Sequence, residues 1–301
     1  MKRSTLCLCA AICLLAGSLS GCAKGNPEAE PPAVPSVTPT PSPTPTPPPI
    51  KNPAGGTVST RFNPPAGYAR IELEPGGFGA YLRELPLKVD GAPVLLLGGQ
   101  VRDGAPAAAT LRMEIAATDH QEGTDALIRL RAEYLYQSEQ TDVISYHFLS
   151  GFACAFSKWS DGYRIRELDI RRVEWQQRAE PSATYGELLS YLNTLFLYAN
   201  AASLSDELLR VSDPRPGDVF VNSKSGGVMI MDMAQNPADG EQVFLLAQSR
   251  IPTQEIYLLR NDSRPDISPW YDVNQAAALI TAEGGVFAWT DLGRFDEMVG
   301  G

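Results

Sequence analysis

The sequence has few of the residues that usually carry metal or nucleophilic chemistry. His120 and His147 are its only histidines, so a metal site built from several histidines is implausible. The sequence contains no glycine-rich phosphate loop, no H-E-x-x-H motif and no G-x-S-x-G motif. A calcium site made of carboxylates stays open, although no EF-hand spacing is present. We therefore predict no cofactor and no metal.

The first residues have the pattern of a secretory signal. Lys2 and Arg3 precede an apolar run over residues 5–19, which is too short and too weakly flanked to be a membrane-spanning helix. The run ends in Leu19-Ser20-Gly21-Cys22, which resembles the lipobox of bacterial lipoproteins. That resemblance implies cleavage after residue 21 and a lipid with palmitate-type chains on the Cys22 thiol. An ordinary signal peptide with a cysteine at its cleavage site is the alternative.

The lipid expected on Cys22 would hold the protein at the extracytoplasmic face of the cytoplasmic membrane. One acylated cysteine with two or three chains is a sufficient anchor. The other N-terminal cysteines lie within the signal, so Cys154 is the one cysteine expected to stay free in the mature chain. An internal disulfide and a cysteine-rich zinc site are then both excluded.

Basic residues are scarce relative to acidic ones. The chain has 25 Lys and Arg residues against 35 Asp and Glu residues, and loss of Lys2 and Arg3 with the signal makes the mature chain more acidic still. Such a chain repels a polyanion, and the sequence has no basic stripe that would reverse this effect. We therefore predict no nucleic-acid partner and no adhesion to an anionic membrane by charge alone.

Composition divides the chain into three parts, of which residues 1–21 are the signal. Residues 22–52 are rich in proline, which alternates with threonine and serine from Thr38 to Pro43, and this composition favours an extended stalk without a packed core. Residues 53–301 have a globular composition without a long proline-rich or glycine-rich break. We predict a single domain there.

The first predicted helix of this domain follows a capping box made by Thr118 and Gln121. Behind the box, apolar residues recur at helical spacing. Asp125, Arg129 and Glu133 form a charge ladder on the other side of the helix.

The remaining predicted elements are two helices and a series of strands. A capping box at Thr184 and Glu187 predicts the second helix, and a shorter third helix is expected over residues 204–210. Alternation or β-rich composition predicts strands over residues 68–73, 94–97, 110–115, 143–148, 152–156, 163–170, 218–221, 228–233, 243–247, 255–259 and 286–289. Long antiparallel meanders with few helices indicate an α+β fold.

Two groups of residues could carry chemistry without any family information. Cys154 lies in the alternating strand over residues 151–156, which offers no helix N-terminus or cation to lower its pKa. We therefore interpret it as a packing residue rather than as a nucleophile served by His147. Trp270 and Tyr271 could stack on a sugar or a cell-wall peptide, although core packing is the simpler explanation.

Six stretches, in order along the chain, resemble segments of the bacterial family DUF 4846, a domain of unknown function. These stretches lie between residues 81 and 271, and the resemblance as a whole reaches from about residue 61 to residue 295. They are YLRELPLK (81–88), RLRAEYLY (129–136), GDVFV (217–221), FLLAQS (244–249), QEI (254–256) and SPWY (268–271).

The family pattern is in turn similar to that of papain-like cell-wall peptidases of the NlpC type. It places Gln-Gln-Cys at the start of a helix, where this chain has Gln121-Glu122-Gly123. It also places Gly-His before a strand, where this chain has Gly226-Gly227. The resemblance implies a papain-like arrangement, in which a helix N-terminus stabilises a thiolate beside an imidazole that takes its proton.

This chain departs from the family pattern at both reactive positions. Gly123 and Gly227 supply neither nucleophile nor base, so we predict no catalytic residue. Gln121 remains where an oxyanion donor would lie, and Gln248 where an orienting group would lie. His120 stays a candidate binding residue, because it directly precedes this vestigial motif.

Three functions are consistent with these residues. The first is a non-catalytic, lipid-anchored relative of papain-like hydrolases that binds a cell-wall peptide, a glycan or an envelope protein in a vestigial cleft near Gly123, Gly227 and Gln248. The second is an active hydrolase that uses Cys154 or a carboxylate pair. The third is a structural or assembly lipoprotein without a ligand cleft. Convergence of the three cleft positions would favour the first function.

Overall fold

The computed structural model describes residues 47–115, 121, 123–169, 172–272 and 278–296. These residues belong to one compact unit. The structure is 22% helical and 30% strand, and its sheet is mostly antiparallel. The predicted α+β class is therefore confirmed.

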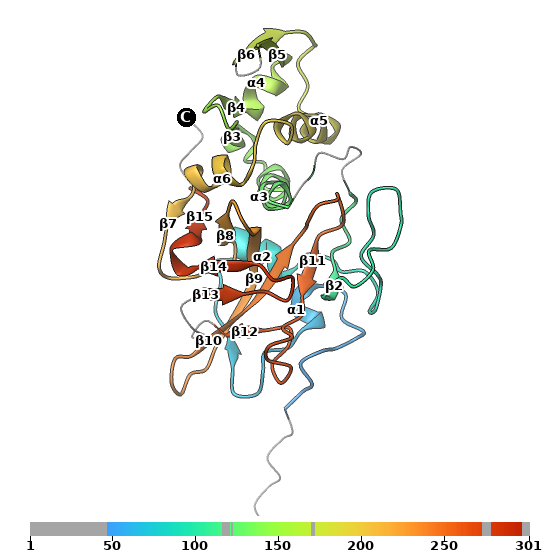
Figure 1. Ribbon diagram of the computed structural model, residues 1–301, viewed down its shortest axis with the longest axis vertical. Helices are drawn as coiled ribbons and strands as arrows, with labels where there is room; N and C mark the ends of the chain where they lie inside the picture. The colour runs from blue at the N-terminus through green and yellow to red at the C-terminus, as the bar shows by residue number, and fades with distance from the viewer. Residues whose placement is uncertain (1–46, 116–120, 122, 170–171, 273–277, 297–301) are drawn as a thin grey trace, which may run out of the picture. The chain divides into compact units, whose positions relative to one another are not determined.

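A nine-stranded sheet forms the base of the fold (Figure 1). Its strands are β1 (Ala69–Arg70), β2 (Ala107–Thr110), β7 (Leu209–Arg210), β8 (Val219–Asn222), β9 (Gly226–Gln235), β10 (Gln242–Gln248), β11 (Tyr257–Leu259), β12 (Tyr271–Asp272) and β15 (Leu292–Arg294). The main path runs β2–β11–β10–β9–β8–β15–β7, while β1 pairs with β9 and β12 pairs with β10. The central strands β9 and β10 read as apolar runs because both of their faces are buried.

Three two-stranded hairpins accompany the large sheet. They are formed by β3 (Ser145–His147) with β4 (Ala153–Ala155), β5 (Tyr163–Asp169) with β6 (Arg172–Gln177), and β13 (Ala278–Ile280) with β14 (Val286–Ala288).

The helices are short apart from two. They are α1 (Val58–Arg61), α2 (Phe78–Arg83), α3 (Asp125–Gln137), α4 (Phe156–Ser160), α5 (Tyr185–Leu195) and α6 (Ala201–Glu207), with the 3-10 helices η1 (Thr141–Val143) and η2 (Trp289–Asp291). In the part of the chain that the structure describes, each helix is too short or too polar to cross a membrane.

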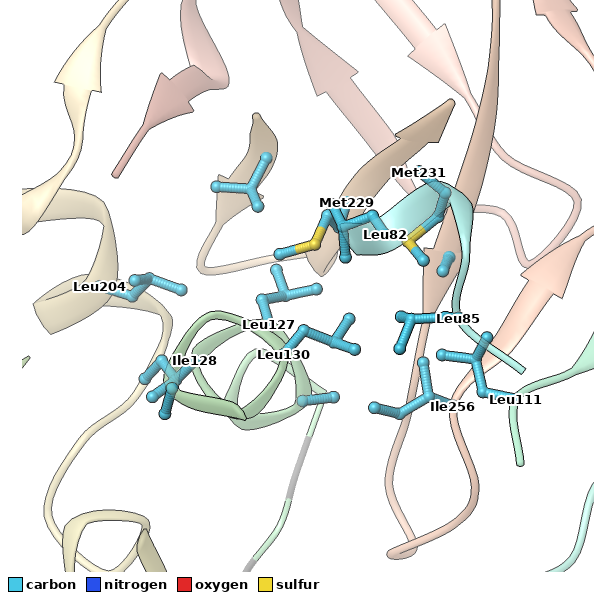
Figure 2. Packing of buried hydrophobic residues seen from close by; sticks show 14 of the residues in the cluster. Leu82, Leu85, Leu111, Leu127, Ile128, Leu130, Leu204, Met229, Met231 and Ile256 are labelled. Carbon is cyan, nitrogen blue, oxygen red and sulfur yellow. The ribbon is translucent and has the colours of Figure 1, made fainter. Parts of the chain in front are cut away.

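The large sheet separates two apolar cores. Successive residues of β9 point to opposite faces, so Met229 and Met231 join one core while Val228 and Ile230 join the other. The first core also contains residues of α2, α3 and α5, and the second contains residues of the β13–β14 hairpin. Figure 2 shows Leu127 of α3 next to Met229 in the first core.

Helix α3 is buried on nearly every side. Ten of its 13 residues are buried, a pattern typical of a helix in the protein interior. The predicted ladder of Asp125, Arg129 and Glu133 is buried together with the apolar residues. Charges in such a position need partners inside the protein, which makes this helix the first place to search for a site.

The first predicted helix begins later than expected. Its N-cap residue is Thr124, whose side chain makes no capping bond. Gln121 lies before the helix and not in its first turn, so its predicted capping role is wrong. Thr118, the other member of the predicted capping box, lies outside the described residues.

The second predicted helix begins where expected but is not held by the predicted capping box. Thr184 is the N-cap residue of α5, yet its side chain makes no capping bond. Glu187 instead accepts hydrogen bonds from Trp159 Nε1 and Arg164 Nη2, both at 2.7 Å. Glu187 therefore bonds to these tertiary partners instead of to the backbone at the start of α5.

Three further predicted elements differ from the structure. The strand predicted over residues 110–115 is instead β2 at Ala107–Thr110. Helix α6 ends at Glu207, and Leu209–Arg210 pair with β15 instead of continuing the helix. Residues 94–97 make only isolated bridges, through Leu95 to Val101 and through Leu96 to Gln254. In these short apolar segments, the contacts with neighbouring segments decide the secondary structure more than the intrinsic propensity of the residues does.

Candidate functional site

The two glycines at the predicted reactive positions lie together at the start of α3. Gly123 precedes the helix, and a methyl group added there would lie 3.4 Å from the Ser249 carbonyl oxygen. Gly227 lies on β9, and a methyl group added there would lie 3.2 Å from Thr124 Cγ2. Both positions that were paired from the sequence therefore border the start of α3.

The space at Gly227 is filled by an apolar side chain. The same added methyl group would lie only 2.6 Å from Leu127 Cδ1, and Leu127 is 0% exposed. Figure 2 shows Leu127 on the side of α3 that faces β9. An imidazole has no room at this position unless Leu127 moves, so α3 and β9 form a packed contact here rather than a cleft.

Gln248 faces the other side of the sheet. Its Nε2 donates to the Tyr257 hydroxyl at 2.7 Å, and that hydroxyl donates to Glu283 Oε1 at 2.7 Å. Arg102 donates to both oxygens of Glu283, at 2.6 and 3.0 Å. Tyr257 belongs to the second core, whereas Leu127 belongs to the first. The structure therefore does not bring the Gln248 side chain together with the two glycines.

Gln121 is held by a buried arginine. Arg129 Nη1 donates to Gln121 Oε1 at 2.9 Å and to the Glu114 carbonyl oxygen at 2.7 Å. Arg129 Nε lies 3.4 Å from Glu133 Oε1, one helical turn away, and the Tyr185 hydroxyl donates to the same oxygen at 2.8 Å. The Arg129 and Glu133 side chains are each only 4% exposed. Each charge thus has the partners that burial requires.

The Arg129–Glu133 pair forms part of the wall of a cavity of about 630 Å³ beside α3. This volume lies within the range of small-molecule sites. The polar wall residues are Tyr81, Glu84, Arg112, Glu114, Arg129, Glu133, Gln137, Tyr185 and Asn193. The apolar wall residues are Leu85, Pro86, Leu111, Met113, Ile115, Leu189, Leu192 and Phe196.

The two tyrosines of the cavity are hydrogen-bond donors at neutral pH. Burial raises the pKa of the Tyr81 hydroxyl, and the nearby Glu133 carboxylate raises it further. Burial also raises the pKa of Tyr185, and so does its hydrogen bond to Glu133. Neither hydroxyl therefore supplies a base to the cavity.

A family model described as "Domain of unknown function (4846)" matches residues 58–294. The chain belongs to the DUF 4846 family. The matched range contains both glycines at the start of α3 and every wall residue of the cavity. No curated protein and no solved structure matches the chain.

Reasoning from the sequence did not single out the Arg129–Glu133 pair of the DUF 4846 domain as functional. Their i, i+4 spacing on the side of the helix away from Leu127 and Ile128 is typical of an exposed ion pair. Local spacing therefore carried no signal that Arg129 and Glu133 are buried.

Trp270 and Tyr271 are core residues of the DUF 4846 domain. Trp270 is 0% exposed, and its Nε1 donates to the Asn63 carbonyl oxygen at 2.9 Å. Tyr271 is 3% exposed and stacks on Phe244, with ring centroids 6.4 Å apart and planes at 9°. Neither ring offers a face to a ligand, so the structure places both residues in packing rather than on a binding surface.

Cys154 is a buried thiol without a base. It is 0% exposed, and burial raises the pKa of its thiol. Cys154 is paired with Tyr146 across the β3–β4 hairpin, whereas His147 is paired with Ala153. Neighbouring strand residues face opposite ways, so the thiol and the imidazole do not form a dyad.

His147 instead contacts Glu207 in a second cavity, of about 420 Å³, which Arg131 of α3 also lines. His147 Nδ1 lies 3.5 Å from Glu207 Oε1, and the His147 backbone N–H donates to the same oxygen. Burial raises the pKa of Glu207 to about 7, although the hydrogen bond from the His147 backbone acts in the opposite direction.

Within the described ranges, no three or more His, Cys, Asp or Glu side chains are grouped so that they could hold a metal ion. His120 and Cys22 lie outside these ranges. The binding role of His120 and the lipid on Cys22 therefore stay predictions.

Proposed function

We propose that this DUF 4846 protein is a lipid-anchored, extracytoplasmic binding module of the cell envelope that carries no catalytic residues. The observation that supports the lack of catalysis is the packing at Gly227, where Leu127 fills the space that a base would need. Gly123 supplies no thiol beside it, and Cys154 is buried elsewhere. A relationship to papain-like hydrolases is part of this proposal, because Gly123 and Gly227 adjoin the start of one helix.

The ligand of the module enters the cavity beside α3 rather than the contact between the two glycines. An apolar wall with a few fixed polar groups is the usual composition of a small-molecule site. Arg129 and Glu133 are already held by Gln121 and Tyr185, so binding would cost little ordering of these side chains.

The module is anchored through Cys22, and its proline-rich stalk holds the domain away from the membrane. Full-length protein grown with an alkyne-tagged palmitate should carry the tag, and Cys22→Ser should not. A tag of equal intensity on the variant would contradict lipid attachment at this residue.

Binding is tested by sedimenting the full chain, in detergent, with isolated cell-envelope fragments. Leu189→Trp narrows the cavity and should reduce the retained protein at least several-fold. Leu197→Trp is the matched control, because Leu197 is 53% exposed and does not line this cavity. Equal retention of both variants would show that the ligand binds elsewhere.

The same samples separate this proposal from the two alternatives. An active hydrolase would release new amino groups or reducing ends from the fragments, and such release would contradict the proposal. An assembly lipoprotein would capture protein partners from solubilised membranes and retain no fragments.

A further inference from the structure

The cavity beside α3 presents a hydrogen-bond donor and an acceptor side by side. Among the described residues, the hydrogen bonds of Arg129 to Glu133, Glu114 and Gln121 start from Nε and Nη1 and none starts from Nη2, while the guanidinium also interacts with the Tyr185 hydroxyl. Within the same set, Glu133 accepts its hydrogen bonds on Oε1 and leaves Oε2 without a donor. Neither Nη2 nor Oε2 is among the fully enclosed polar atoms that lack a partner. Arg129 and Glu133 both line the cavity, which makes these two atoms the candidates to meet a ligand there.

The charges of this pair select against a charged ligand. The guanidinium and the carboxylate lie 3.4 Å apart, so a ligand carboxylate or ammonium would be attracted by one group and repelled by the other. A hydroxyl group is different, because it both donates and accepts. Two adjacent hydroxyls can therefore satisfy Arg129 Nη2 and Glu133 Oε2 together.

The rest of the wall fits the body of a sugar. Phe196, Leu189 and Leu192 supply apolar surface for the C–H faces of a pyranose ring. The Tyr81 hydroxyl accepts from Gln137 at 3.4 Å and has no acceptor of its own in the described part of the chain. It is a further donor for a sugar oxygen.

We infer that the cavity binds a neutral pyranose through two adjacent free hydroxyls, one accepting from Arg129 Nη2 and the other donating to Glu133 Oε2. The inference rests on the proposed function and names the chemical class of its ligand. Neutral 1,4-linked glucans carry such a hydroxyl pair, O2 and O3, on every unit. Inner units of a β-1,4-linked N-acetylglucosamine chain do not, because an acetamido group and the linkage flank their remaining ring hydroxyl.

The experiment titrates the full chain, in a detergent without a sugar head group, with cellotriose, triacetylchitotriose and permethylated cellotriose. Binding is followed by calorimetry. We expect cellotriose to bind at least tenfold more tightly than permethylated cellotriose, which has no free hydroxyl, and also more tightly than triacetylchitotriose, whose only adjacent ring hydroxyls are O3 and O4 of its non-reducing unit. An equal affinity for permethylated cellotriose would overturn the inference.

Glu133→Gln tests the acceptor directly. The variant keeps an oxygen for Tyr185 but can replace Oε2 by a donor, and we expect cellotriose to bind about tenfold to a hundredfold more weakly. Glu174→Gln is the matched control, because Glu174 is exposed on β6 and does not line the cavity. Unchanged affinity in Glu133→Gln would contradict the inference.

A second variant covers the case in which Glu133→Gln fails to fold. Tyr185→Phe removes only the hydroxyl that orients Glu133, and it should weaken cellotriose binding about threefold to tenfold. The two proposals can fail separately. Retention of envelope fragments without any cellotriose binding overturns the sugar inference alone, whereas loss of both overturns the proposed function as well.

Discussion

The start and the middle of α3 meet the rest of the protein in opposite ways. At its start, the helix packs against β9 so closely that a methyl group on Gly227 would fit only if Leu127 moved. One to two turns further along, Arg129 and Glu133 line a cavity. The comparison shows that missing side chains do not by themselves leave a cleft, because apolar neighbours such as Leu127 close the gap. Space persists where charged side chains keep apolar groups from collapsing onto them.

The largest expected loss of stability comes from removing Arg129, the cation that lines the cavity. Arg129→Ala leaves Glu133 as a buried charge and deprives Gln121 of its donor. We expect the free energy of unfolding in urea to fall by about 3–5 kcal/mol. A loss below about 1 kcal/mol would mean that the Arg129–Glu133 ion pair does not stabilise this part of α3.

Glu207 of α6 lies in the second cavity, which α3 also lines through Arg131. It can be compared with Glu133, because in the described part of the chain no arginine bonds to Glu207. Its pKa is raised from 4.5 to about 7 by burial, so the folded state binds its proton more tightly than the unfolded state does. The resulting stability is fully present below pH 4.5 and is lost as the pH rises through about 7.

The corresponding variant is Glu207→Gln, compared with the wild type by urea unfolding from pH 4 to 8. The wild type should lose on the order of 3 kcal/mol relative to the variant across this range. His147→Gln is the control, because the imidazole contacts the same carboxylate. Parallel pH profiles for the wild type and Glu207→Gln would contradict the raised pKa.

At the contact between β9 and the start of α3, Gly227→Ala should destabilise the protein by about 1–3 kcal/mol, because its methyl group collides with Leu127. The cost should shrink in a Leu127→Ala background, where the colliding atoms are absent. Additive effects in this double-mutant cycle would show that the two residues do not compete for the same space.

The smallest effect is expected from the other glycine. Gly123→Ala places its methyl group at an ordinary contact distance, 3.4 Å from the Ser249 oxygen, so the free energy of unfolding should change by less than about 0.5 kcal/mol. A loss as large as that of Gly227→Ala would mean that the whole start of α3 is tightly packed.

The sequence pattern predicted the strands over residues 228–233 and 243–247 because apolar residues on both faces are a local property of central strands. It misplaced the start of α3 because Gln121, which matches a capping residue, bonds to Arg129 instead. That contact depends on how the preceding segment folds back onto the helix, which local spacing does not encode.

The candidate site was predictable only in part. The resemblance paired Gly123 with Gly227, and the structure places both beside α3. The resemblance could not indicate that Leu127 occupies the space between α3 and β9, because this depends on side-chain volumes from two distant segments. The polar cavity was missed for a related reason, since charges at helical spacing are usually exposed and those of Arg129 and Glu133 are not.

The burial of Cys154 makes this protein convenient for site-directed spectroscopy. A thiol that is 0% exposed does not meet a maleimide or a nitroxide reagent in the folded state, and the Cys22 thiol would already be capped by lipid. If the signal is removed and Cys22 carries lipid as proposed, a cysteine introduced by Gly123→Cys would be the single reactive thiol of the protein. A spin label there would report on the start of α3 without background from the native chain.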